Sequence, residues 1–102
     1  MEAKTIEVVT FDLKEGVSKA EASRKLQALN EFVKDYEGFI KRSISCNEDG
    51  KWVDIVYWES RELAVKAASE VSHSPKAMEI FQVIDENSIQ MNHYEVISSL
   101  NE

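Results

Sequence analysis

The sequence predicts an α+β domain with the ferredoxin-like order β-α-β-β-α-β, in which a four-stranded antiparallel sheet carries helices on one face. Three observations predict this fold. The chain has 102 residues, which suits one hydrophobic core. Runs of β-branched and aromatic residues alternate with segments of helical periodicity. One helical segment separates the first two strand-like runs, and further helical sequence precedes the last. We therefore expect a single domain over residues 1–102.

The first strand and helix are predicted by composition and by a helix-capping signal. Lys4–Asp12 is rich in β-branched and aromatic side chains, which are typical of a strand. Ser18, with Glu21 three residues later, forms a capping-box pattern and predicts a helix over Lys19–Asp35. The apolar stripe of this helix is expected to consist of Ala22, Leu26, Leu29, Val33 and Tyr36.

A hairpin is predicted to follow this helix. Gly38 suits a left-handed helix end, and Phe39–Cys46 reads as the second strand. Asn47–Gly50 then provides a turn, because Asp-Gly tolerates positive φ angles. Lys51–Glu59 is the third strand, antiparallel to the second.

The second half of the chain predicts a helical layer and a closing strand. Ser60 is a helix cap, and Arg61–Val71 has small and apolar residues on one face. Pro75 favours the start of a new helix, which we expect over Lys76–Ile84. Ser88–Ile97 alternates in polarity and is the fourth strand.

The hairpin predicts a partner for the sheet. With a turn at Asn47–Gly50, Ser43 is expected opposite Asp54. In this register apolar side chains lie on both faces of the hairpin. One face would hold Ile40, Arg42, Ile44, Cys46, Val53, Ile55 and Tyr57, and the other Phe39, Lys41, Ser43, Ser45, Trp52, Asp54, Val56 and Trp58. Helices on one side cover only one of these faces. We therefore expect a second copy of the chain to cover the other, forming a barrel-like homodimer.

Charge and composition exclude several classes of partner. The formal net charge is −7 and the isoelectric point is near 4.8, which disfavours binding to nucleic acids and to anionic membranes. No apolar stretch approaches the ~18 residues of a transmembrane helix. The single cysteine, Cys46, cannot form an internal disulfide, so we expect a cytoplasmic protein.

Four segments resemble a known family. They are Tyr36–Phe39, Val56–Glu62, Ser72–Pro75 and Met91–Glu95. Through them the chain resembles the antibiotic biosynthesis monooxygenase (ABM)-like proteins of the dimeric α/β-barrel superfamily. The resemblance implies a homodimer with a pocket between sheet and helices in each subunit. In characterised relatives that pocket is the site either of cofactor-free oxidation of aromatic polyketides or of haem degradation. The chain resembles the first, quinone-forming branch more closely, so no cofactor is expected.

The same resemblance proposes catalytic residues. Some quinone-forming relatives pair a polar amide residue with a Trp four positions later on the third strand, and Asp54 and Trp58 have this spacing. Residues four apart on a strand share a face and can border one cavity. Asp54 would be the base and Trp58 the platform, with His93 as an alternative base. The candidate pocket residues are Tyr57, His73, Met78, Phe81 and Tyr94.

Structural interpretations of these residues stand beside the catalytic ones. Trp58 is typical of a core or interface aromatic residue. Asp54 is placed to accept from Ser43, or to pair with a cation of the preceding strand, Lys41 or Arg42. His93 is also typical of a histidine whose ring is satisfied at a helix or dimer contact.

Three functions follow from the sequence. The first is a cofactor-independent monooxygenase, an oxidoreductase acting on a small phenol- or quinol-type molecule. The alternative is a non-catalytic dimeric module that binds a small apolar or aromatic molecule or is associated with stress. An isomerase or lactone-processing enzyme of the same superfamily stays open. Haem degradation is disfavoured, because the first strand has no Asn and Ala67 stands where such enzymes have a helix Trp.

Overall fold

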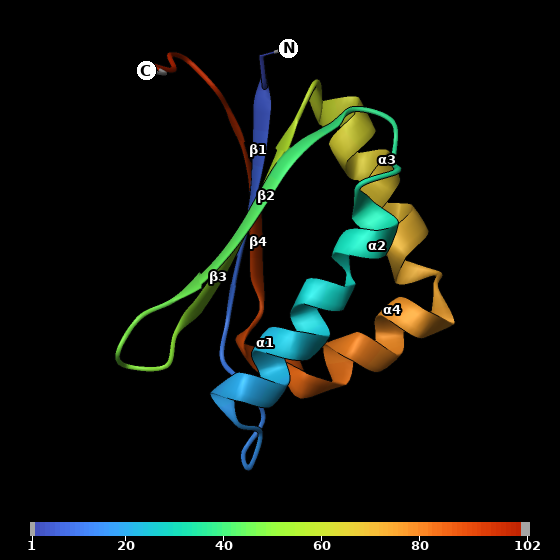
Figure 1. Ribbon diagram of the computed structural model, residues 1–102. Helices are drawn as coiled ribbons and strands as arrows, with labels where there is room; N and C mark the ends of the chain where they lie inside the picture. Colours follow the sequence, from blue (N-terminus) through green and yellow to red (C-terminus); the bar gives the residue numbers. More distant parts are fainter. Residues whose placement is uncertain (1, 101–102) are drawn as a thin grey trace.

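The computed structural model describes residues 2–100 and confirms the predicted fold. The sheet is antiparallel throughout, with the strand order β2-β3-β1-β4, so β2 and β4 are its edges. All the helices lie on one side of it (Figure 1). The strands are β1 (Thr5–Phe11), β2 (Phe39–Cys46), β3 (Trp52–Trp58) and β4 (Gln90–Glu95).

The helical layer consists of α1 (Lys19–Ala28), α2 (Asn30–Val33), α3 (Arg61–Ser72) and α4 (Pro75–Ile80). Serine side chains cap three of them, as the Oγ atoms of Ser18, Ser60 and Ser74 each accept a backbone N–H three residues later. No helix within residues 2–100 is long and apolar enough to cross a membrane.

Two predicted helices are interrupted. The helix predicted over Lys19–Asp35 divides at Leu29, whose N–H bonds to the carbonyl of Leu26 in a tighter turn. The predicted apolar stripe survives the break, because Leu26 and Leu29 both remain buried. The helix predicted over Lys76–Ile84 begins at Pro75 and continues from α4 into a 3₁₀ turn at Phe81–Val83.

The predicted hairpin register was wrong by one residue. The Oδ1 of Asn47 accepts from the N–H groups of both Asp49 and Lys51, so the loop extends through Lys51 before Cys46 pairs with Trp52. Ile44, and not Ser43, therefore lies opposite Asp54. A slip of one residue moves a whole strand to the other face.

This correction re-sorts the two faces of the hairpin. Arg42, Ile44 and Cys46 share the helix-facing side with the inward residues of β3, Asp54 among them. An irregularity between Phe39 and Lys41 returns the start of β2 to register with Trp58.

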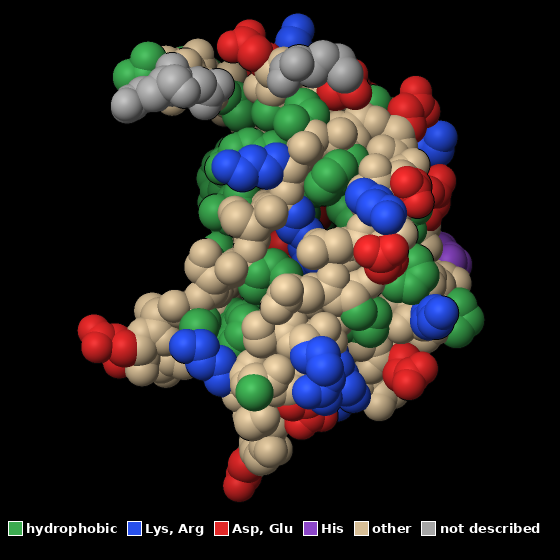
Figure 2. Space-filling model, in the orientation of Figure 1, with side chains coloured by type: hydrophobic (Ala, Val, Ile, Leu, Met, Phe, Trp, Pro, Cys, Tyr) green, Lys and Arg blue, Asp and Glu red, His purple; other side chains and the backbone are tan. Residues whose placement is uncertain are grey.

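The core lies between sheet and helices, and the outer face of the sheet carries a second set of apolar side chains. The largest fully buried side chains are Phe11 and Leu26. Alternation along the strands places a half-buried or exposed apolar group on the opposite face, made of Ile6, Val8, Val53, Ile55, Tyr57 and Tyr94. No helix covers this face (Figure 1), whereas the helical side carries interspersed acidic and basic side chains (Figure 2).

Gly38 is the turn on which the docking of α3 depends. Its φ is +88°, and a Cβ atom there would lie 2.6 Å from Leu63 Cδ1. We expect Gly38→Ala to reduce the free energy of unfolding by about 2 kcal/mol or more, because backbone strain and overpacking add. Denaturant unfolding measures this loss.

Gly50→Ala is the matched control. Its φ is +84°, but nothing lies within 4 Å of the added Cβ, so only the backbone cost of about 1 kcal/mol applies. Equal losses in the two variants would contradict the clash with Leu63.

Candidate functional site

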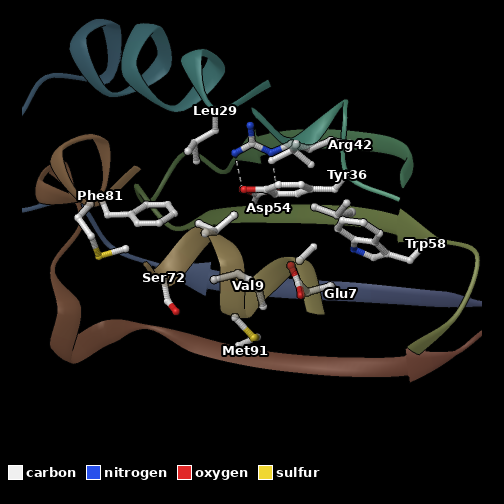
Figure 3. A pocket seen from close by; sticks show the side chains of 16 residues that line it. Glu7, Val9, Leu29, Tyr36, Arg42, Asp54, Trp58, Ser72, Phe81 and Met91 are labelled. Carbon is white, nitrogen blue, oxygen red and sulfur yellow. Dashed lines mark hydrogen bonds and ion pairs between the residues drawn. The ribbon is translucent and has the colours of Figure 1, made fainter. Parts of the chain in front are cut away.

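A cavity of about 200 Å³ lies between the inner face of the sheet and the helices. Figure 3 shows the side chains that surround it. Most of its lining is apolar, and its charged lining residues are Glu7, Arg42 and Asp54. The full lining consists of Glu7, Val9, Leu29, Val33, Tyr36, Arg42, Asp54, Val56, Trp58, Ala67, Ala68, Val71, Ser72, Met78, Phe81 and Met91.

Glu7 is a buried carboxyl group held by a histidine. Strand pairing sets Glu7 opposite His93, and the Oε2 of Glu7 lies 2.9 Å from the His93 Nε2. Only 11% of the Glu7 side chain and 14% of that of His93 are exposed. Burial raises the pKa of Glu7 and the charge of Asp54 raises it further, whereas His93 and Arg42 oppose the rise.

Arg42 and Asp54 form a buried ion pair with two hydrogen bonds. The Arg42 Nε and Nη2 donate to the two oxygens of Asp54 at 3.0 and 2.6 Å. Arg42 Nη1 donates to the Leu26 carbonyl and to Asn30 Oδ1. All three guanidinium nitrogens thus donate to protein acceptors, and both oxygens of Asp54 accept from Arg42 (Figure 3).

Trp58 presents a polar atom that has no partner. The residue is 2% exposed, and its indole Nε1 has no hydrogen-bond acceptor within residues 2–100. A buried N–H donor without an acceptor costs free energy, and because the atom itself is buried, a ligand oxygen can accept from it only when the side chains around it shift. Trp58 is a diagonal neighbour of Glu7, because Thr5 pairs with Trp58 and Glu7 with Val56. Glu7 and Trp58 therefore lie next to each other on one wall of the cavity, with the unpartnered Trp58 N–H buried inside that wall.

The structure brings together four of the residues selected from the sequence. Asp54, Trp58, Met78 and Phe81 all line the cavity. His93 lies behind Glu7 and reaches the cavity wall through it. Of the two cations offered as partners for Asp54, the structure selects Arg42.

Three candidate pocket residues do not line this cavity. The prediction that Tyr57 and Tyr94 line the pocket was wrong, because both side chains lie on the outer face of the sheet. There they flank Ile6 of β1, which pairs with Tyr57 on β3 and with Tyr94 on β4. His73 is exposed at the end of α3, where its Nδ1 lies 2.7 Å from the Ser69 carbonyl oxygen. It is a helix-end residue, and its prediction as a pocket residue was wrong.

The sequence interpretation missed Glu7 as a site residue. In the sequence, Ile6 and Val8 alternate with Glu7, which indicates an apolar face for Ile6 and Val8 and a polar face for Glu7. The opposite alternation, through Thr5, Val9 and Phe11, is the one that faces the helices. Glu7 could have been recognised from its spacing to Phe11, the largest apolar side chain of that strand. The two are four residues apart, so they share one face of the strand.

The arrangement can recognise and deprotonate a hydroxyl group. A carboxylate in apolar surroundings is a stronger base than in water, because burial raises its pKa. The Trp58 N–H can stabilise the oxygen that becomes negative. The apolar walls exclude water from a reactive intermediate.

Solved structures of other proteins share this fold. SnoaB of Streptomyces nogalater, a cofactor-independent oxygenase, aligns with a TM-score of 0.78 at 16% identity, over 98% of this chain and 99% of its own. A monooxygenase from the ActVA-Orf6 gene of Streptomyces coelicolor, solved in complex with nanaomycin D, gives 0.72 at 15% identity, over 98% and 93%. A dimeric ferredoxin-like protein from an uncultured marine organism gives 0.70 at 17% identity, over 99% and 94%.

These similarities confirm the fold that the sequence resemblance implied. No protein-family model and no curated protein matches the chain. The chain is thus similar in fold, over nearly its whole length, to oxygenases that differ from it at most positions.

The raised pKa of Glu7 predicts a pH-dependent stability. At pH values below the pKa that Glu7 has in the unfolded protein, Glu7 is protonated in both the folded and the unfolded state. Its ionisation then contributes nothing to the free energy of unfolding. As the pH rises, the unfolded state ionises first, so stability is lost until the pH exceeds the higher pKa of the folded state. We expect Glu7→Gln to raise the melting temperature relative to the parent at pH 8, and to leave it nearly unchanged at pH 4.

Thermal unfolding of both proteins across this pH range measures the difference. Glu95→Gln, an exposed change on β4, is the control and should give no pH-dependent difference. A gain from Glu7→Gln that is larger at pH 4 than at pH 8 would mean that the folded protein lowers the pKa of Glu7.

Proposed function

We propose that this protein is a cofactor-independent monooxygenase that oxidises a small phenol- or quinol-type aromatic molecule in the cavity between sheet and helices. One observation carries the proposal. The buried carboxyl group of Glu7 lies next to Trp58, whose buried N–H has no partner, on one wall of an apolar cavity. The fold shared with SnoaB and the ActVA-Orf6 monooxygenase supports it.

The proposed reaction begins with removal of the hydroxyl proton by Glu7. The resulting electron-rich ring passes one electron to dioxygen, and the two radicals combine to form a carbon–oxygen bond. The O–O bond then breaks as the proton on the same ring carbon leaves, giving a quinone and water. One substrate and one O₂ thus give one quinone and one water, and the four electrons lost by the substrate reduce both oxygen atoms.

The contacts of each residue determine the role that we propose for it. Glu7 is the base, because both oxygens of Asp54 are occupied by Arg42. His93 holds Glu7 by donating its Nε2–H to the Glu7 Oε2, so the substrate proton goes to the Glu7 Oε1. Trp58 donates to the substrate oxygen as it becomes an anion. Asp54 forms the wall beside them and holds Arg42 in place.

We further propose that the working form is a cytoplasmic homodimer. The uncovered outer face of the sheet carries Ile6, Val8, Val53 and Ile55, which a second copy packed face to face would bury. A dimeric ferredoxin-like protein shares the fold and supports this arrangement.

Oxygen-dependent quinone formation tests the enzyme proposal. We expect purified protein to convert 1-naphthol to 1,4-naphthoquinone, with one atom of ¹⁸O₂ in the product. Glu7→Gln and Trp58→Phe should each lower kcat by about 10²-fold, the usual size of a lost base or oxyanion donor. Glu95→Gln should keep the parent rate.

The same assay distinguishes the monooxygenase from the alternative function, a non-catalytic module that binds a small apolar or aromatic molecule. A binding module would show melting-temperature shifts with these molecules and no quinone above the rate in buffer. Equal rates for parent, Glu7→Gln and Trp58→Phe would reject Glu7 and Trp58 as catalytic residues.

Sedimentation tests the dimer. We expect a two-chain particle at micromolar concentration, and we expect Ile55→Glu on the outer face to dissociate it, because a charge cannot be buried there unpaired. Val65→Glu is the control, since Val65 is an exposed residue of α3. A parent that sediments as a single chain of 11.7 kDa would contradict the proposal.

A further inference from the structure

We infer that the cavity selects uncharged hydroxyarenes of one or two fused rings and excludes those that carry a carboxylate. This inference rests on the proposed function, because it concerns the substrate of the same site. It follows from the charges on the cavity wall, from the volume of the cavity and from the position of its polar atoms.

The cavity wall offers no free cation to an anionic substrate. Arg42 is its only basic residue within residues 2–100, and all three of its guanidinium nitrogens already donate to protein acceptors. Its side chain is 4% exposed, so it cannot turn toward a ligand without leaving Asp54 as an unpaired buried charge.

The remaining charge on the wall is negative. Glu7 ionises within the cavity when it acts as a base, and Asp54 lies on the same wall. A substrate carboxylate would lose its hydration and face these groups without a counter-ion. The net charge of −7 opposes the approach of anions at longer range. A neutral hydroxyl group does not lose the hydration of a charge, meets no repulsion from Glu7 and Asp54, and is not repelled by the net charge of the protein.

The volume limits the number of rings. An apolar cavity of about 150 Å³ accommodates a benzene molecule. This cavity, at about 200 Å³, therefore encloses one ring and part of a second. Its exposed lining residues, Ser72, Met78 at 40% and Met91 at 49%, mark the mouth. A third ring would extend past them into water and gain little burial.

The polar atoms set the orientation of the ring. Glu7 is buried, whereas Met78, Met91 and Ser72 are exposed at the mouth, where the Ser72 Oγ already donates to the Ser69 carbonyl. The hydroxyl group that meets Glu7 therefore points inward and the far ring edge points to the mouth. A substituent on the hydroxyl-bearing ring is then enclosed with it. A carboxylate on that ring is the group against which the site discriminates most strongly.

Anaerobic calorimetry tests charge selection without turnover. The probes are 1-naphthol, 4-hydroxy-2-naphthamide and 4-hydroxy-2-naphthoate, of which the last two match in shape and differ in charge. We expect the amide to bind at least about thirty-fold more tightly than the carboxylate, since leaving a buried charge unpaired is costly. 1-Hydroxyanthracene, with a third ring, should bind no more tightly than 1-naphthol.

A variant identifies the source of the discrimination. Glu7→Gln keeps the shape of the wall and removes a negative charge, so the ratio of amide to carboxylate affinity should fall at least about three-fold. Glu95→Gln should leave the ratio unchanged. Equal binding of amide and carboxylate to the parent protein would overturn the inference, as would the absence of binding by both neutral probes.

The test distinguishes this inference from the proposed function. Tight, charge-selective binding without quinone formation in the presence of oxygen would reject the oxygenase and leave the ligand class intact. Quinone formation from a carboxylated aromatic that binds as tightly as its amide would support the oxygenase and reject the ligand class.

Discussion

The buried ion pair of Arg42 and Asp54 is the interaction on which the rest of the site depends. It joins β2 to β3 and then reaches the helical layer through the Leu26 carbonyl in the last turn of α1 and through Asn30 at the start of α2. Removing one partner of such a pair leaves an uncompensated buried charge, at a cost of about 3 to 5 kcal/mol. The pair therefore fixes the distance between sheet and helices, and with it the cavity between them.

The same pair determines which group on the wall is free to react. Arg42 occupies both oxygens of Asp54, whereas His93 contacts only the Oε2 of Glu7. Glu7 is therefore the base in the proposed reaction. Burial raises the pKa of Glu7, and Trp58, whose buried N–H has no partner, is its diagonal neighbour in the sheet. An apolar cavity with one base and one donor is suited to a hydroxyl group more than to a carboxylate.

Periodicity and turn chemistry predicted the fold well and the site less well. Element order, helix caps and the positive φ of Gly38 are local properties, and the structure confirms them. The hairpin register depended on a side-chain contact of Asn47 that composition does not reveal, and an error of one residue moved Arg42 to the wrong face. Glu7 and His93 are separated by 86 positions along the chain, so only the pairing of β1 with β4 shows that they meet.

The position of a bound hydroxyarene tests the central claim most directly. A crystal structure of the anaerobic complex with 1-naphthol should show the hydroxyl oxygen within about 3.2 Å of both a Glu7 carboxyl oxygen and Trp58 Nε1, with the second ring toward Met78 and Met91. The Arg42–Asp54 pair should remain intact. A ligand bound instead in the pocket lined by Lys19, Gln27 and Cys46, or one whose hydroxyl group faces the solvent, would contradict the account.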